Sequence, residues 1–297
     1  MRGREAICLV LIVFSILTLN TSLIVATVAG GAAEAWEPAT RPTNRGKLKL
    51  AAPPSGAVTG PDRGALLLCS VSSPEIRGKF LKLAGGSEAK IVMVVNHVPD
   101  TGDPADAERR VARTWGVAKV TFWWLTDRQS AEDKVILGAI RDASGLWIPG
   151  GRPPEYLDAL IDSSAHRELT ALLSRGGVIG GESAGAVVQS TFVAPPSGAP
   201  YAGPALEGLG FARNLAIFPH FGGASAKFPP QFCQRLIAEH QGLAGLALPD
   251  GSAVIVRGKS VEVVGKGVEL IWRAMDGNIT TTTYVSASHF TLPEDIK

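Results

Sequence analysis

A serine flanked by glycines carries the strongest chemical signal in the sequence. The segment Gly181-Glu182-Ser183-Ala184-Gly185 has the G-x-S-x-G spacing of a nucleophile elbow, a sharp strand-to-helix turn that exposes a reactive hydroxyl. Small flanking residues are needed there because the serine backbone is strained and neighbouring chains come close. The turn also leaves the backbone N–H of Ala184 at a helix N-terminus, where the dipole favours a developing oxyanion. The pattern therefore indicates nucleophilic acyl transfer.

A serine nucleophile needs a base, and the base needs a carboxylate that orients it. His220 directly follows the apolar run 215–218, at the carboxyl end of an expected strand, where open α/β sheets build their sites. Asp250 lies in a Pro-Asp-Gly turn, although an aspartate there is usually only a turn former. Two chain orders stay open from the residues alone: Ser183, His220, Asp250, or the α/β-hydrolase order Ser183, Asp250, His289. The other histidines are one weaker candidate at a strand end and two in charged helical patterns: His97, His166 and His240.

The elements that must position these residues alternate between β-branched runs and helical patterns from Gly64 onward. This alternation is typical of an α/β fold with a mostly parallel sheet flanked by helices on both faces. Expected strands are 65–69, 91–95, 120–124, 145–148, 178–179, 215–218 and 253–257. Expected helices are 74–83, 105–114, 131–141, 166–175 and 230–239. The C-terminal runs 260–264, 268–273 and 280–286 are expected as antiparallel strands.

The N-terminus has the features of an export signal. Arg2 and Arg4 precede an apolar stretch, and small residues then lead to Ala33-Glu34-Ala35, which fits an A-x-A cleavage site. We interpret residues 1–35 as a signal peptide, 36–63 as a Pro/Gly/Ala-rich linker and 64–297 as a single α/β domain. The protein is thus expected to be exported, periplasmic or extracellular, with a membrane anchor as the alternative if the segment is not cleaved.

Composition excludes several classes of protein. An apolar fraction of 45% is ample for a packed core, which excludes a disordered chain. The 29 basic and 27 acidic residues give a net charge of +2, too small a field to argue for nucleic acid. Three scattered cysteines form neither a disulfide framework nor a zinc cluster. No metal or cofactor is expected.

These residues resemble the cyanophycinase and aspartyl dipeptidase group, serine peptidase family 51. The likeness runs from about residue 64 to about residue 267, and its sharpest element is 181–186, similar to the family's G-x-S-A-G-A elbow. Residues 147–152 are similar to the family's glycine pair after the preceding strand, and 217–221 to the region that supplies its histidine. The turn 249–251 is similar to the one that carries its acidic residue. The resemblance implies a class I glutamine amidotransferase-like fold, which is flavodoxin-like.

Carried onto this sequence, the resemblance implies Ser183 as nucleophile, His220 as general base and Asp250 as the orienting carboxylate. The amides of Gly151 and Ala184 become the oxyanion hole. Family members cleave peptides on the carboxyl side of aspartate, as α-Asp-X dipeptides or β-Asp-Arg linkages. The expected function is that of an exported serine-type peptidase, with an aspartyl peptide as substrate and an acyl-enzyme intermediate. A homodimer is compatible with the resemblance.

Four places on the expected substrate edge depart from the family pattern: Cys69 to Val71, Asn96 to Val98, Glu182 and Pro153. Arg152 is the expected ligand of the aspartyl carboxylate, with a structural ion pair as the alternative. Glu182 could act on His220 or repel an acidic substrate, or it could lie sideways in a salt bridge. Two other functions stay open, an α/β-hydrolase-type esterase that uses His289 and a catalytically impaired peptide-binding homologue.

Overall fold

A computed structural model of the chain describes residues 48–95, 103–195, 204–223 and 228–294. All of them belong to one compact unit, Trp36–Lys297. The expected signal peptide, most of the expected linker, and the candidates Asn96 and His97 lie outside the described residues. Among the helices of the described ranges, none combines the length and hydropathy that a membrane crossing requires.

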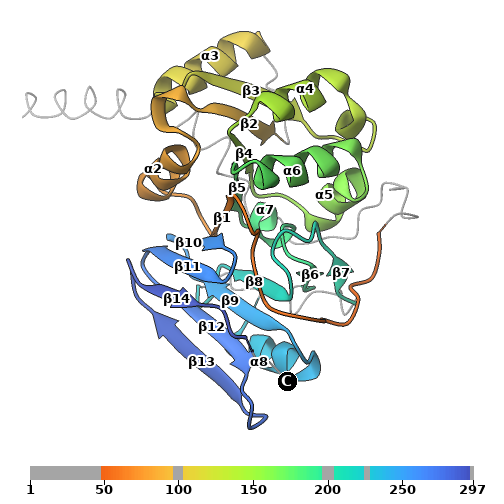
Figure 1. The fold of residues 1–297 in the computed structure, drawn as a ribbon, viewed down its shortest axis with the longest axis vertical. Coiled ribbons are helices and arrows are strands. Elements are labelled where there is room, and N and C mark those ends of the chain that lie inside the picture. Colours follow the sequence, from red (N-terminus) through yellow and green to blue (C-terminus); the bar gives the residue numbers. More distant parts are fainter. Residues whose placement is uncertain (1–47, 96–102, 196–203, 224–227, 295–297) are drawn as a thin grey trace, which may run out of the picture. The chain divides into compact units, whose positions relative to one another are not determined.

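The larger sheet has eight strands in the order β14-β11-β10-β1-β5-β4-β2-β3 (Figure 1). Five neighbouring strands run parallel: β1 Ala65–Cys69, β5 Val178–Glu182, β4 Gly145–Ile148, β2 Lys90–Val95 and β3 Lys119–Trp124. Three antiparallel strands extend the sheet beyond β1: β10 Ser252–Arg257, β11 Ser260–Gly265 and β14 His289–Thr291. The expected mixed α/β fold with antiparallel C-terminal strands is confirmed.

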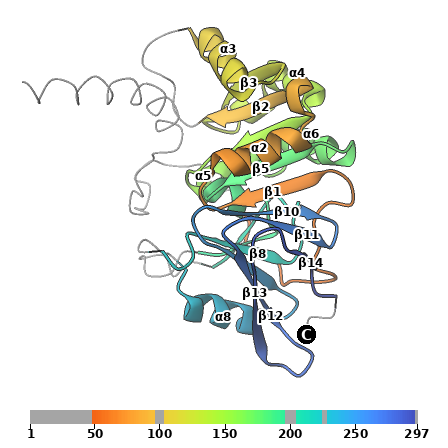
Figure 2. The same cartoon turned by 90° about the vertical axis from the view of Figure 1, so that its left-hand side faces the viewer.

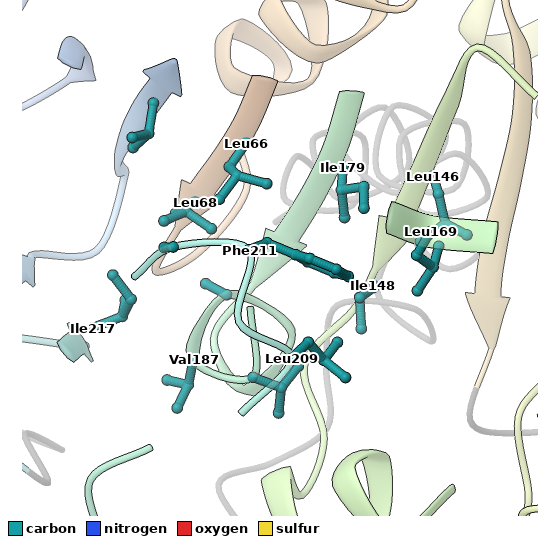
Figure 3. Close-up of a cluster of buried hydrophobic side chains, with 14 of the residues drawn as sticks. Leu66, Leu68, Leu146, Ile148, Leu169, Ile179, Val187, Leu209, Phe211 and Ile217 are labelled. Carbon is teal, nitrogen blue, oxygen red and sulfur yellow. The ribbon is translucent and has the colours of Figure 1, made fainter. Parts of the chain in front are cut away.

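Helices cover both faces of this sheet because successive side chains of a buried strand point to opposite sides. In β1, Leu66 and Leu68 enter one core, and Leu67 and Cys69 enter the other. The first core includes apolar side chains of α4 Lys134–Asp142, α5 Pro153–Leu160, α6 Ser164–Ser174 and α7 Ala184–Val187. Figure 3 shows a part of this core, including Leu66, Leu169 and Val187. The second core includes side chains of α2 Pro74–Leu83 and α3 Pro104–Trp115. Two 3₁₀ turns complete these connections, η2 Gly86–Glu88 and η3 Ser130–Glu132.

Local sequence explains where the helices begin. Ser73, Asp103, Asp133 and Ser163 each precede a helix and accept a hydrogen bond from a backbone N–H of its first turn. Proline occupies the start of α2, α3 and α5, where its missing N–H costs no hydrogen bond. These caps fix the helix starts, and the helices then hold the strand ends that carry the polar residues.

A second sheet, absent from the sequence-based expectation, has four strands in the order β13-β12-β9-β8. Its strands are β8 Leu215–Pro219, β9 Ala244–Leu248, β12 Val268–Arg273 and β13 Ile279–Tyr284. Helix α8, Pro230–Glu239, lies on this sheet, as Figure 2 shows, and its Cys233 and Ile237 share a core with Phe218. The strand before His220 is therefore paired with β9 and does not belong to the large sheet.

Strand β9 went unpredicted because its sequence, Ala-Gly-Leu-Ala-Leu, contains no β-branched residue. Its glycine is required by packing, since a Cβ on Gly245 would lie 2.5 Å from the ring of Phe218. Tertiary packing thus outweighs local propensity in this strand.

The described part of the expected linker, residues 48–63, packs against the domain. Leu50 forms a bridge to Leu206 in the short strand β7 Leu206–Glu207, which pairs with β6 Phe192–Val193. Val58 is fully buried, and Asn214 donates hydrogen bonds to three carbonyls at positions 55–57. This stretch is consequently part of the folded domain.

Candidate active site

The nucleophile elbow lies between β5 and α7. Ser183 has φ 51° and ψ −115°, a conformation that side-chain-bearing residues adopt only at a cost, and its N–H donates to the carbonyl of Cys69 over 2.9 Å. A Cβ on Gly181 would lie 2.2 Å from the side-chain nitrogen of Gln189. One on Gly185 would lie 2.1 Å from the carbonyl oxygen of Ile148. Close backbone approach therefore explains both glycines of the G-x-S-x-G spacing.

His220 meets the serine from the other sheet. It follows β8 with φ 57°, and its Nε2 lies 2.9 Å from Ser183 Oγ. This is hydrogen-bond distance between a nucleophile and a base. His289 instead lies exposed on β14 at the rim of the large sheet, opposite Glu262. Of the two chain orders left open by the sequence, the structure brings together the residues of the first.

Asp250 completes a relay of side chains. Asp250 lies in the turn between β9 and β10, and its side chain is 49% exposed. Its Oδ1 lies 2.8 Å from Nδ1 of His220. Burial by itself would raise the pKa of Asp250. Hydrogen bonds from Ser70 and His220 together with the charge of Lys266 outweigh this effect, so the pKa is lowered. Asp250 is thereby held as a carboxylate facing the imidazole.

Ser70 is the site residue that sequence reasoning missed. It follows β1, is fully buried, and its Oγ lies 2.6 Å from Asp250 Oδ1 and 2.7 Å from the backbone nitrogen of His220. In the sequence it is part of the departure Cys69 to Val71, at a strand end beside others that carry polar residues, but nothing there indicates a hydrogen-bonding role for it. A serine in that position is too common to single out.

The glycine pair after β4 lies beside the nucleophile. A Cβ on Gly150 would be 3.8 Å from Cβ of Ser183. The hydroxyl of Tyr156 donates to the carbonyls of Pro149 and Gly150, at 3.2 and 3.1 Å, and so fixes the loop. Within the described ranges, neither the Gly151 amide nor the Ala184 amide donates a hydrogen bond to the protein. Both donors can therefore serve an oxyanion.

Arg152 and Glu182 are the two charged residues expected near the substrate: Arg152 follows the glycine pair, and Glu182 directly precedes Ser183. Arg152 pairs with Glu155 of α5 at 3.1 Å, and its side chain is 41% exposed. Glu182 accepts hydrogen bonds from Ser72, and it makes no ion pair with any lysine or arginine of the described residues. Burial raises the pKa of Glu182, and the hydrogen bonds from Ser72 only partly oppose that rise. The salt bridge considered for Glu182 is thus absent from this part of the chain.

Two of the departures from the family pattern have structural explanations. Cys69 is fully buried with its Sγ 3.3 Å from the carbonyl of Gly181, and burial raises the pKa of its thiol well above the ordinary value. Pro153 is the first residue of α5, where proline's fixed φ suits the helix. No cluster of three or more histidine, cysteine, aspartate or glutamate side chains that could hold a metal occurs in the described ranges.

Comparisons with known proteins place the chain among peptidases. The family model described as Peptidase family S51 matches residues 66–264. The crystal structure of a peptidase from an acI-B1 Actinobacterium has a TM-score of 0.60 and 18% identity, covering 79% of this chain and 99% of that one. A structure described as a putative peptidase E protein from Listeria monocytogenes EGD-e has a TM-score of 0.49 and 18% identity, covering 68% of this chain and 98% of that one. No curated protein matches the chain significantly. At 18% identity, the likeness to the actinobacterial peptidase shows a shared fold.

Proposed function

Since the chain belongs to peptidase family S51 and is a serine-type peptidase, we propose that Ser183, His220 and Asp250 are its catalytic residues. The observation that carries the proposal is the continuous relay of 2.9 Å between Ser183 and His220 and 2.8 Å between His220 and Asp250. The hydrogen bond to Asp250 keeps the proton on Nδ1, which leaves the lone pair of Nε2 directed at the serine hydroxyl. A base in that tautomer can activate the nucleophile.

The reaction that this arrangement supports is acyl transfer to water. Ser183 Oγ forms a bond to the scissile carbonyl carbon while its proton passes to Nε2 of His220, and the carbonyl oxygen becomes an oxyanion. The amides of Gly151 and Ala184 donate to that oxyanion. The C–N bond then breaks, and the imidazolium gives its proton to the leaving amine. Water attacks the acyl-enzyme with His220 again as base, which releases the acid and restores the serine.

We propose an aspartyl peptide as the substrate, cleaved on the carboxyl side of aspartate. The family resemblance of the elbow and of the glycine pair supports this substrate, and Arg152 supplies a cation directly after the glycine pair. Glu155 pairs with that guanidinium at 3.1 Å, and the side chain of Arg152 is 41% exposed. A guanidinium is the side chain best suited to bind a carboxylate through two parallel hydrogen bonds. In this scheme Arg152 binds the aspartyl side chain.

Export is part of the same proposal. The A-x-A pattern ending at Ala35 predicts a mature protein that begins at Trp36. N-terminal sequencing of the protein from the outer compartment checks this expectation, and a chain that retains residues 1–35 in the membrane would support the anchored alternative.

The catalytic proposal is tested by labelling and substitution. A fluorophosphonate probe should attach to Ser183, as located by peptide mass spectrometry. The Ser183→Ala and His220→Ala proteins should each lose kcat by about 10⁴-fold or more. His289→Ala is the matched control, because an esterase of the α/β-hydrolase type would need that histidine and this peptidase does not. Retained peptide hydrolysis by Ser183→Ala would overturn the proposal, and an unlabelled wild-type protein would support the catalytically impaired homologue.

The substrate proposal needs its own assay. The wild-type protein is compared on α-Asp-X dipeptides, β-Asp-Arg, and the matching Asn-X and Glu-X dipeptides. Cleavage is expected for the aspartyl substrates alone. The Arg152→Met variant should raise KM for aspartyl substrates by about tenfold to a hundredfold, the effect of losing a hydrogen bond to a charged group, and an unchanged KM would assign Arg152 to its pair with Glu155.

A further inference from the structure

A buried hydroxyl joins the base to its carboxylate. Ser70 is fully buried, and its Oγ lies within hydrogen-bond distance of both His220 and Asp250. We propose that Ser70 is a positioning residue that holds His220 and Asp250 in register with the nucleophile. This inference rests on the proposed catalytic roles of these residues and assigns Ser70 no contact with substrate.

The hydroxyl of Ser70 both donates and accepts a hydrogen bond at this position. A hydroxyl has one donor and two acceptor lone pairs. Ser70 donates to Asp250 Oδ1 over 2.6 Å and accepts the backbone N–H of His220 over 2.7 Å. Nδ1 of His220 lies 3.3 Å from the same oxygen, but its proton has a nearer acceptor in Asp250 at 2.8 Å. One side chain therefore restrains the backbone of the base and the carboxylate that orients it.

The backbone of His220 needs such a restraint. Its φ of 57° lies in the left-handed region, which residues other than glycine adopt at a cost. The N–H of a residue just past a strand end has no ladder partner by default, and here Ser70 accepts it. The hydrogen bond favours the turn that brings Nε2 to the serine.

Ser70 also lies where the two sheets meet. Ser183 directly follows β5 of the large sheet, whereas His220 directly follows β8 of the small sheet. The carbonyl of Cys69 accepts the N–H of Ser183 at 2.9 Å, and the next residue, Ser70, accepts that of His220. Ser70 is itself fixed by its N–H, which donates to the carbonyl of Ser252 in β10, the neighbour of β1 in Figure 1. Cys69, the last residue of β1, and Ser70, which follows it, thus hold the backbones of the nucleophile and the base next to each other.

The test compares Ser70→Ala with Ser252→Ala. Both serines are fully buried, but within the described residues the hydroxyl of Ser252 has no hydrogen-bond partner. Ser70→Ala is expected to lower kcat about tenfold to a hundredfold, as for the loss of one hydrogen bond to a charged group, with little change in KM. Fluorophosphonate labelling of Ser183 should slow in the same proportion. Ser252→Ala should change kcat by less than about threefold, since it leaves no new group unpaired.

A double-mutant cycle separates positioning from a general structural role. If Ser70 acts through the carboxylate, replacing it in an Asp250→Ala background should reduce kcat far less than in the wild type. Losses that simply multiply would overturn the inference, as would a Ser70→Ala protein with wild-type kcat. Should Ser70→Ala not fold, Ser70→Thr and Ser70→Val form an isosteric pair, and the threonine variant should retain at least about tenfold more kcat.

The two proposals fail in distinguishable ways. If the wild-type protein is not labelled at Ser183, the catalytic proposal fails before any Ser70 variant is measured. If it is labelled and Ser70→Ala reacts at the same rate, only the positioning role of Ser70 fails.

Discussion

The strained backbone of Ser183 can be measured by removing its side chain in two ways. Ser183→Ala keeps a Cβ on a residue with φ 51° and ψ −115°, whereas Ser183→Gly removes it. Both variants lose Oγ and therefore the hydrogen bond to His220. The difference in their free energies of unfolding thus isolates the cost of placing a Cβ in this conformation.

The magnitude follows from two opposing terms. A residue held in a sparsely populated region of φ and ψ carries about 1–3 kcal/mol of strain. Glycine offsets part of this gain because it makes the unfolded chain more disordered, by about 0.5–1 kcal/mol. Ser183→Gly is therefore expected to be more stable than Ser183→Ala by about 1 kcal/mol, within limits of about 0 and 2.5 kcal/mol. A difference of about 1 kcal/mol corresponds to about 2–4 °C in Tm for a domain of this size.

Urea unfolding followed by tryptophan fluorescence measures this difference, and neither variant should hydrolyse peptide. The matched control is Ser174, the last residue of α6, where the same pair of substitutions should have the opposite order because glycine is the poorer helix former. A Ser183→Gly protein no more stable than Ser183→Ala would refute the assignment of strain to the elbow.

Three further outcomes are expected. Gly185→Ala should lower the free energy of unfolding by about 1–3 kcal/mol or more and abolish probe labelling, since its Cβ would meet a backbone carbonyl at 2.1 Å. Its control is Gly138→Ala, in open space within α4, which should raise the free energy of unfolding by about 0.5–1 kcal/mol. Equal effects of the two substitutions in urea unfolding would contradict the packing argument. Because burial raises the pKa of Glu182, ionisation of this carboxyl lowers the stability of the folded state as the pH rises. In urea unfolding, Glu182→Gln should therefore be more stable than wild type at pH about 8 and lose that advantage below the ordinary pKa of 4.5. An advantage that persists below that pH would contradict a raised pKa for Glu182. Burial raises the pKa of the Cys233 thiol to about 12 and that of the Cys69 thiol well above its ordinary value. Peptide mapping should therefore find neither thiol alkylated in the native protein, and alkylation before unfolding would show them accessible.

Local signals account for what could be predicted from the sequence. The five parallel strands are short β-branched or apolar runs, and the elbow is defined by glycines within five residues. Both can therefore be predicted from the local sequence, without knowledge of contacts between distant residues. Prediction was weaker for the second sheet, because β9 lacks β-branched residues and is held by packing against the Phe218 ring. The membership of β8 in that sheet is likewise a matter of distant pairing.

The candidate site divides along the same line. Ser183 could be singled out by its neighbours in the chain, but the choice between His220 and His289 required a family resemblance. The role of Ser70 could not be predicted, although the stretch Cys69 to Val71 departs from the family pattern, because its hydrogen-bond partners are 150 and 180 residues away in the sequence. The role of a buried serine depends on the polar groups that the fold places next to it, which the neighbouring sequence does not reveal.

The placement of the serine and the imidazole on different sheets has a consequence for how the protein loses activity. A slip of about one ångström between the sheets would lengthen the Ser183–His220 contact past hydrogen-bonding range, while every strand and helix kept its internal bonds. Turnover would then fall under mild heat or denaturant before circular dichroism registered any change. Catalysis in such a molecule reports on the docking of two intact layers, a property that a secondary-structure spectrum does not detect.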